Sequence, residues 1–127
     1  MDADSTRDYL LGKPEAWVDY PFGPGPAVFK VRQKMFALLM DDASKGPRLN
    51  LKCDPVQAQM LRDVFEAVQP GYHMNKRHWN TVLLDGSLPD GEVQRMIDHS
   101  YSLVVKGLKV VERKALELAW GPDTLYR

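Results

Sequence analysis

Hydrophobic and polar residues alternate most strictly over residues 48–53 of this chain. The alternation places three residues on each side: Leu49, Leu51 and Cys53 against Arg48, Asn50 and Lys52. A period of two is that of an extended chain, so we predict a half-buried strand with its apolar side toward the core.

Three segments before this one also favour strands. Residues 15–20 alternate weakly, and residues 27–32 and 34–40 are runs of strand-forming residues. A turn at Arg32-Gln33 would join the last two into a hairpin. Neither residue readily takes the positive φ that short hairpin turns prefer, so the register stays open there. Residues 21–26, with three prolines and two glycines, and residues 41–47 are predicted loops.

The apolar spacing changes to that of amphipathic helices after residue 53. Asp54 can cap a helix over 54–69, with Pro55 in its first turn. Ser87 and Asp90 have capping-box spacing before a second helix over 88–106, which Gly107 ends. Shorter helices are predicted over 4–12, where Ser5 and Asp8 have capping-box spacing, and over 112–120. The long helices would bury two stripes: Val56, Met60, Leu61, Val64, Phe65 and Val68 on the first, and Val93, Met96, Ile97, Ser100, Tyr101, Val104 and Val105 on the second.

The order of these elements predicts the fold class. Two more strands, over 72–77 and 79–85, lie between the long helices, so the order is helix, three or four strands, helix, one or two strands, helix. Strands that cluster in this way favour a single α+β domain, an antiparallel sheet with helices packed on one face.

Composition excludes several classes of protein. The chain has 127 residues, 44% of them hydrophobic, as in one soluble globular domain. Its longest apolar run, 35–40, is too short to span a bilayer, and the acidic N-terminus does not resemble a signal peptide. A single cysteine, Cys53, suits a reducing compartment, so we expect a cytoplasmic protein without a membrane partner.

Basic residues gather in the predicted strands although the net charge is zero. Residues 27–53 hold six basic and two acidic side chains, and residues 70–80 hold two basic side chains and no acidic one. If helices cover the other face, the open face would be positive and could contact phosphates. An ordinary solvated face explains the same charges, and from these residues alone the zero net charge favours that interpretation. The candidate nucleic-acid contacts are Lys30, Arg32, Lys34, Arg48, Lys52, Lys76, Arg77, His78 and Trp79.

The sequence offers little evidence for a catalytic site, a metal site or a cofactor site. His73 and His78 would point to opposite faces of a strand, and the cations between them oppose a metal ion. Cys53 precedes a helix N-terminus, which can activate a thiol, but it shares the inward face of Leu49 and Leu51. Gly23-Pro24-Gly25 lacks the amide donors of a phosphate loop. We therefore expect no enzyme, no cofactor and no bound metal.

Five sequence blocks in order resemble the MmcQ/YjbR family of small bacterial proteins. They are Tyr20-Pro21-Phe22-Gly23; Phe29-Lys30-Val31 with Lys34-Met35-Phe36-Ala37; Asn50-Leu51-Lys52-Cys53; residues 73–79, His-Met-Asn-Lys-Arg-His-Trp; and Ser100-Tyr101 with Val104-Val105-Lys106. The resemblance implies one domain over 1–127, with its core at about 4–108 and an extension over 109–127. It also implies the order α-β(3)-α-β(2)-α, similar to secretion-chaperone-like domains.

Two functions stay open. The family is described as DNA-binding by analogy with a double-wing sheet that lies on DNA, and the basic strands favour double-stranded DNA as the partner. The zero net charge favours the alternative, a protein-interaction or chaperone-like module whose sheet face or edge receives a partner segment. The sequence leaves the oligomeric state open.

Overall fold

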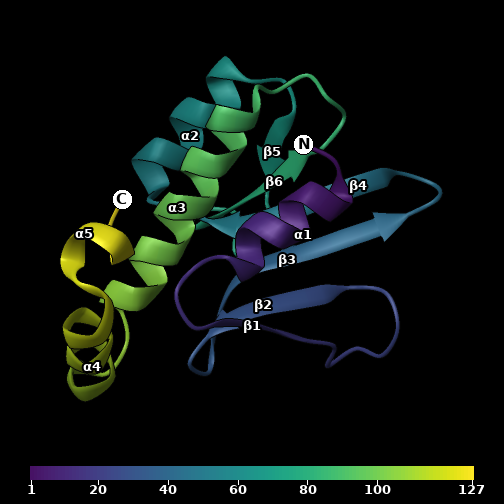
Figure 1. The fold of residues 1–127 in the computed structure, drawn as a ribbon. Helices are drawn as coiled ribbons and strands as arrows, with labels where there is room; N and C mark the ends of the chain where they lie inside the picture. The colour runs from purple at the N-terminus through teal and green to yellow at the C-terminus, as the bar shows by residue number, and fades with distance from the viewer.

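Six antiparallel strands form one sheet in the computed structural model, which covers residues 1–127 (Figure 1). The strands are β1 (Ala16–Asp19), β2 (Ala27–Val31), β3 (Lys34–Asp42), β4 (Gly46–Lys52), β5 (Val68–Pro70) and β6 (Trp79–Leu83). Their spatial order is β1-β2-β3-β4-β6-β5. Strand β6 therefore lies between β4 and β5, and β5 is the edge strand at that side. The predicted α+β class with an antiparallel sheet is confirmed.

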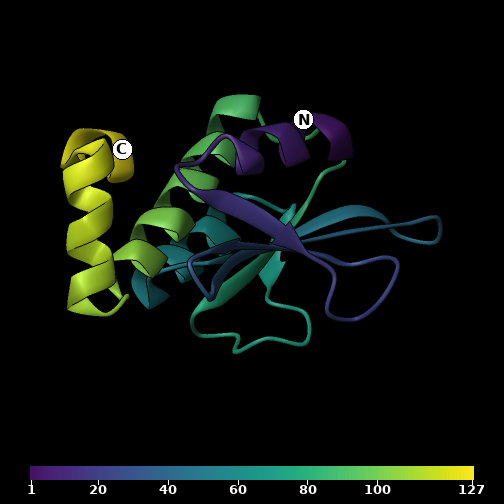
Figure 2. The same cartoon turned by 60° about the horizontal axis from the view of Figure 1, so that its bottom comes forward.

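Five helices complete the chain. They are α1 (Ala3–Leu11), α2 (Pro55–Val64), α3 (Asp90–Lys106), α4 (Val110–Trp120) and α5 (Pro122–Leu125). Figure 2 shows α1 and α3 above the sheet, while the 71–78 loop projects below it. The C-terminal α4 and α5 stand beside the end of α3, away from the sheet (Figure 1). No helix is long and apolar enough to cross a membrane.

Helix α3 forms the centre of the core, as its apolar spacing predicted. All seven residues of its expected stripe are buried. The Tyr101 ring meets Phe36 edge-on at 5.3 Å, and its hydroxyl donates to Pro14 O at 2.7 Å. A bulge in β3 leaves Phe36 without a partner residue in β2, and Ser100 Oγ donates to its carbonyl at 2.6 Å. Ser100 also accepts from Lys52 N at 2.9 Å, so one hydroxyl fastens α3 to β3 and β4.

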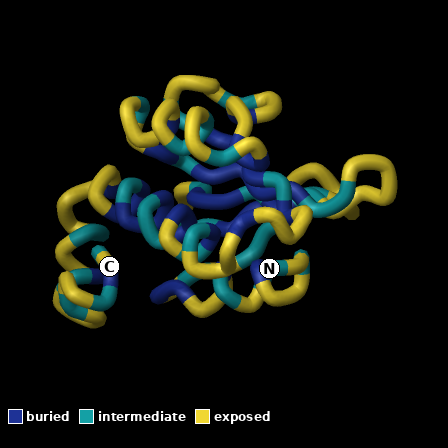
Figure 3. Tube along the Cα trace, turned by 90° about the horizontal axis from the view of Figure 1, so that it is seen from above, coloured by how far each residue is buried: buried dark blue, intermediate teal, exposed yellow.

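The first long helix is shorter than predicted and its stripe is largely exposed. It ends at Val64, and Val68 belongs to β5 instead. Val56, Met60 and Val64 are 55–70% exposed, whereas the small Ala58 is fully buried. Helix α2 lies at one side of the sheet, where its main contacts are with β5 and β6, so a single narrow face of it reaches the core. Figure 3 shows the resulting distribution, with burial concentrated in the strands and in α3.

Four local predictions are wrong. The expected 41–47 loop is a three-residue turn, because β3 and β4 pair as far as Asp42 and Gly46. Residues 72–77 form a loop, and the strand of that region is β5. Ser87 donates its hydroxyl to Asp85 and does not cap α3, which Pro89 precedes without a side-chain cap. Helix α1 begins with a capping box of Asp2 and Ser5, one turn earlier than the expected Ser5 and Asp8.

Candidate nucleic-acid interface

The sheet face turned away from the helices carries four of the nine predicted contacts, Lys30, Arg48, Lys52 and Trp79. Leu49 and Leu51 point into the core, so Arg48, Asn50 and Lys52 point to the opposite face. The inward position of Cys53, which is 4% exposed, confirms the predicted register of this strand. We call this surface the open face. The register assigns to it Trp17, Asp19, Val28, Lys30, Met35, Leu38, Met40, Arg48, Asn50, Lys52, Gln69, Trp79, Thr81 and Leu83.

Two tryptophans and two lysines cross the open face at one level. Trp17 of β1 pairs with Lys30 of β2, Lys30 with Met35 of β3, and Lys52 of β4 with Trp79 of β6. We call these five residues the Trp–Lys row. The Lys30 ammonium lies 5.1 Å from the centre of the Trp17 ring, and all five side chains are only partly buried or exposed. Sequence analysis missed Trp17, and only the β1–β2 register could have indicated it.

Acidic side chains neutralise three of the predicted cations. Lys30 pairs with Asp19 at 2.9 Å and Arg32 with Glu15 at 3.5 Å. The hydrogen bond from Lys30 holds the pKa of Asp19 below its usual value, so this pair is charged at neutral pH.

Arg48 is the third neutralised cation. It pairs with Asp42, is 8% exposed, and lies against the Tyr72 ring. The pKa of Asp42 is lowered mainly by the hydrogen bond from Ser44 and the amide of Lys45. Arg48 therefore stabilises the β3–β4 turn and is not available to bind a phosphate.

Four predicted cations have no carboxylate partner. Lys34 is exposed next to the β2–β3 turn, and Lys52 ends β4 within the Trp–Lys row. Lys76 and Arg77 are exposed in the 71–78 loop, where the Lys76 ammonium donates to Gly71 O at 3.2 Å. These four side chains take part in no ion pair, so they form the positive part of the candidate interface.

A buried polar network holds the 71–78 loop against the open face. Thr81 Oγ1 donates to Asn50 Oδ1 at 2.6 Å and accepts from Tyr72 N at 2.9 Å, while Asn50 Nδ2 donates to Tyr72 O at 3.1 Å. Asn50 is fully buried although it points away from the helices. This network holds the start of the loop at Tyr72, and nothing in the local sequence pattern indicated it. The pairing of β4 with β6 places Trp79 beside Lys52, and Cys53 N donates to His78 O at 2.7 Å.

The residues weighed for catalysis or metal binding are not gathered into such a site. No three His, Cys, Asp or Glu side chains lie in a geometry that could hold a metal ion. Burial, with a smaller effect of Asp54, raises the pKa of the Cys53 thiol to about 11, which opposes a nucleophilic thiolate.

Comparison with known proteins assigns the chain to a family. The YjbR family model matches residues 11–103. The protein YjbR of Escherichia coli K12, described as uncharacterized, is 36% identical over 116 residues, which are 91% of this chain and 98% of that protein. The chain belongs to the YjbR family.

Other relatives of this YjbR-family chain agree with its fold. YyaQ of Bacillus subtilis, also described as uncharacterized, is 34% identical over 67% of this chain and 82% of its own length. The crystal structure of Deinococcus radiodurans protein DR2400, of the domain family DUF419, superposes with a TM-score of 0.82 at 36% identity, covering 91% of this chain and 87% of that one. A Pseudomonas syringae protein superposes with a TM-score of 0.73 at 36% identity, over 81% and 98% of the two chains. The fold described above is therefore that of the family.

Proposed function

We propose that this YjbR-family protein binds double-stranded DNA through the open face and catalyses no reaction. The observation that supports the proposal is the Trp–Lys row, in which partly exposed indoles stand beside lysines on a sheet face that no helix covers. Lysines on such a face can contact phosphates, and indoles can stack on bases where these are unpaired.

The ion pairs limit how many phosphates the face can neutralise. Lys30, Arg32 and Arg48 already have carboxylate partners, which leaves Lys34, Lys52, Lys76 and Arg77. Three or four phosphate contacts correspond to a slope of roughly −3 to −4 in the logarithm of the binding constant against the logarithm of salt concentration. At physiological salt the dissociation constant should be about micromolar or weaker, as for other binding that relies on phosphates.

Fluorescence anisotropy with a labelled duplex, at several salt concentrations, tests the proposal. Lys52→Ala should weaken binding to all sequences alike and flatten the slope by about one unit. Asp19→Asn should do the reverse, because it frees Lys30 without removing a cation. Asp123→Asn is the matched control, since it makes the same charge change on exposed α5.

The two asparagine variants separate a local effect from a change in net charge. Equal gains in both would show that only net charge matters, and absence of duplex binding at low salt would refute the DNA proposal. A single strand of the same sequence shows whether Trp17 and Trp79 stack on bases, because stacking requires unpaired bases and would make the single strand the tighter ligand.

A protein-interaction module is the second candidate, and the exposed side of α2 favours it. Val56, Met60 and Val64 recur at every fourth position and lie in solvent. A partner bound there would be held by apolar contacts, so its affinity should change little with salt and should fall in Met60→Glu. DNA affinity should be nearly unchanged in that variant, because α2 contacts β6 from the face opposite Trp79, where Asn80 Nδ2 donates to Ala58 O.

A further inference from the structure

A second concave region lies on the helix side of the sheet and shares only Lys52 with the candidate DNA surface. It is a groove of about 420 Å³ between α2 and α3, with β4 and β6 as its floor and the C-terminal residues at one end. This volume lies within the range of pockets that bind small organic molecules. Its lining residues are Lys52, Cys53, Gln57, Leu61, Asn80, Glu92, Arg95, Met96, His99, Ser102, Lys106, Tyr126 and Arg127.

The inner end of the groove holds an unsatisfied hydrogen-bond acceptor. Asn80 is 2% exposed, and its Nδ2 donates to Ala58 O at 3.3 Å. That bond fixes the orientation of the amide, and its Oδ1 has no donor. Leaving a buried acceptor without a donor costs free energy, so this position favours a ligand that supplies a hydroxyl or N–H group.

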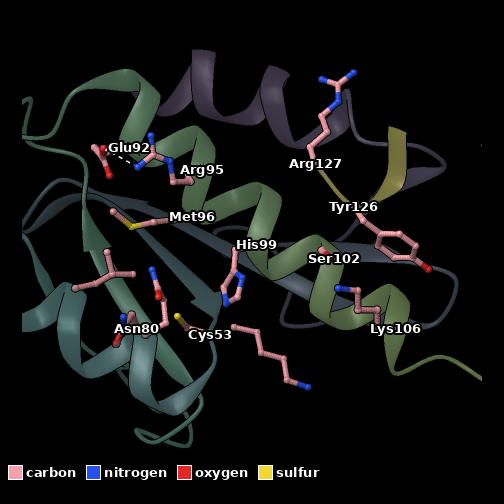
Figure 4. A pocket seen from close by; sticks show the side chains of 13 residues that line it. Cys53, Asn80, Glu92, Arg95, Met96, His99, Ser102, Lys106, Tyr126 and Arg127 are labelled. Atoms are coloured by element: carbon pink, nitrogen blue, oxygen red, sulfur yellow. Dashed lines mark hydrogen bonds and ion pairs between the residues drawn. The ribbon is translucent and has the colours of Figure 1, made fainter. Parts of the chain in front are cut away.

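The side chains of α3 add a cation and an imidazole N–H donor to the lining of the groove. Figure 4 shows the His99 ring and the Lys106 side chain projecting from α3 into the groove, with Cys53 on the opposite wall. His99 Nε2 accepts from Asp54 N at 3.4 Å, which leaves Nδ1 as the N–H donor of the neutral ring. Lys106 forms no ion pair, whereas Arg95 pairs with Glu92 at 3.2 Å. Lys106 follows His99 by about two helical turns, and its ammonium lies 5.0 Å from the centre of the Tyr126 ring. An ammonium without a carboxylate partner suits the carboxylate or phosphate group of a ligand.

The groove also has apolar lining residues. Leu61 and Met96 line it and can contact the apolar part of a ligand. From this arrangement we propose that the groove binds a small amphipathic organic anion, whose acid group meets Lys106 and whose hydroxyl or N–H group donates to Asn80 Oδ1. The proposal does not depend on DNA binding, which uses the other face.

Three related probes test the proposal by ¹⁵N-resolved NMR titration. 4-Hydroxyphenylacetate carries both the acid group and a donor, phenylacetate lacks the donor, and tyramine has the donor but a positive charge. For a fragment of this size we expect a dissociation constant on the order of millimolar for the first probe, with shifts confined to the groove. Loss of the donor should weaken binding about three- to tenfold, the net effect of one hydrogen bond. Tyramine should bind more weakly still.

Lys106→Gln tests the cation without disturbing the core, because Lys106 is exposed at the end of α3. It should weaken 4-hydroxyphenylacetate severalfold and leave tyramine unaffected or improved. Lys114→Gln, on the exposed part of α4, is the control and should change neither affinity. The proposal is overturned if millimolar 4-hydroxyphenylacetate causes no shifts, if the shifts lie outside the groove, if tyramine binds equally well, or if Lys106→Gln has no effect.

Discussion

Gly71 shows how one residue without a side chain positions the candidate interface. A Cβ at this position would lie 2.8 Å from both the Cβ and the carbonyl oxygen of Trp79. Gly71 N donates to that same carbonyl at 2.9 Å, so the close approach is part of the β5–β6 pairing. The absence of a side chain therefore allows the 71–78 loop to start directly against Trp79.

We predict that Gly71→Ala destabilises the protein by about 1–3 kcal/mol, the usual cost of forcing an atom into a packed site. Gly91→Ala is the matched control, because a Cβ there meets nothing within 4 Å and the residue lies in the first turn of α3. It should be neutral or stabilising by up to about 1 kcal/mol. Urea melts of both variants measure the difference, and equal stabilities would refute the packing argument.

Arg32 shows a residue whose backbone is set by contacts distant in sequence. It adopts φ of 55° in the β2–β3 turn, a region that favours glycine. Trp17 Nε1 donates to its carbonyl at 2.8 Å and Glu15 pairs with its guanidinium. These two contacts from the preceding segment hold a turn that the local sequence disfavours.

The two long helices differ in how much of their surface the sheet covers. Helix α3 crosses β2, β3 and β4, whereas α2 mainly contacts β5 and β6. The same kind of apolar spacing therefore leads to burial on α3 and to exposure on α2. Periodicity identifies the apolar side of a helix but does not tell how much of that side the rest of the fold will bury.

Substitutions on the two helices should reflect this difference. We predict that Ile97→Ala, at a fully buried position of α3, costs about 2–5 kcal/mol because it leaves a cavity. Val64→Ala, 70% exposed on α2, should stay within about 0.5 kcal/mol of the wild type. Denaturant midpoints, measured with an unchanged denaturant slope, give both free energies of unfolding, and a large loss in Val64→Ala would contradict the exposure of this side chain.

Titration of buried groups should give the whole molecule a stability plateau between about pH 7 and pH 9. Burial lowers the pKa of His99 from 6.5, so the unfolded chain binds a proton more readily and stability falls as the pH drops below that value. Burial raises the pKa of Cys53 from 9.0 to about 11, and of Tyr9 and Tyr101 above their usual value, so stability falls as the pH rises above 9.

Urea melts from pH 5 to pH 10 test this profile. His99→Gln should reduce the loss on the acid side, where the charges of Asp54 and Lys106 act on the ring in opposite directions. Cys53→Ala should reduce the loss on the alkaline side and leave the acid side unchanged. A stability independent of pH in the wild type would contradict both assignments.

The distribution of charge on the open face emerges only in the folded molecule. The basic strands are visible in the sequence, but Asp19 and Glu15 reach Lys30 and Arg32 from β1 and the segment before it, through strand pairing. A count of cations along the chain therefore overstates the positive charge that the surface presents. Only the four unpaired cations are available to phosphates, so the DNA-binding constant should depend less steeply on salt concentration than the full count of basic residues would suggest.

Local patterns in the chain were sufficient for the class of fold, the order of its elements, the register of β4 and the buried stripe of α3. Alternation and helical spacing are properties of neighbouring residues, and they report which side of an element is apolar. Tertiary structure alone decided that α2 stays largely exposed, that β6 inserts between β4 and β5, that Asn50 and Thr81 hold the 71–78 loop, and that Asn80 faces the groove. Each of these depends on contacts between segments far apart in the chain, whose energies no short window of residues contains.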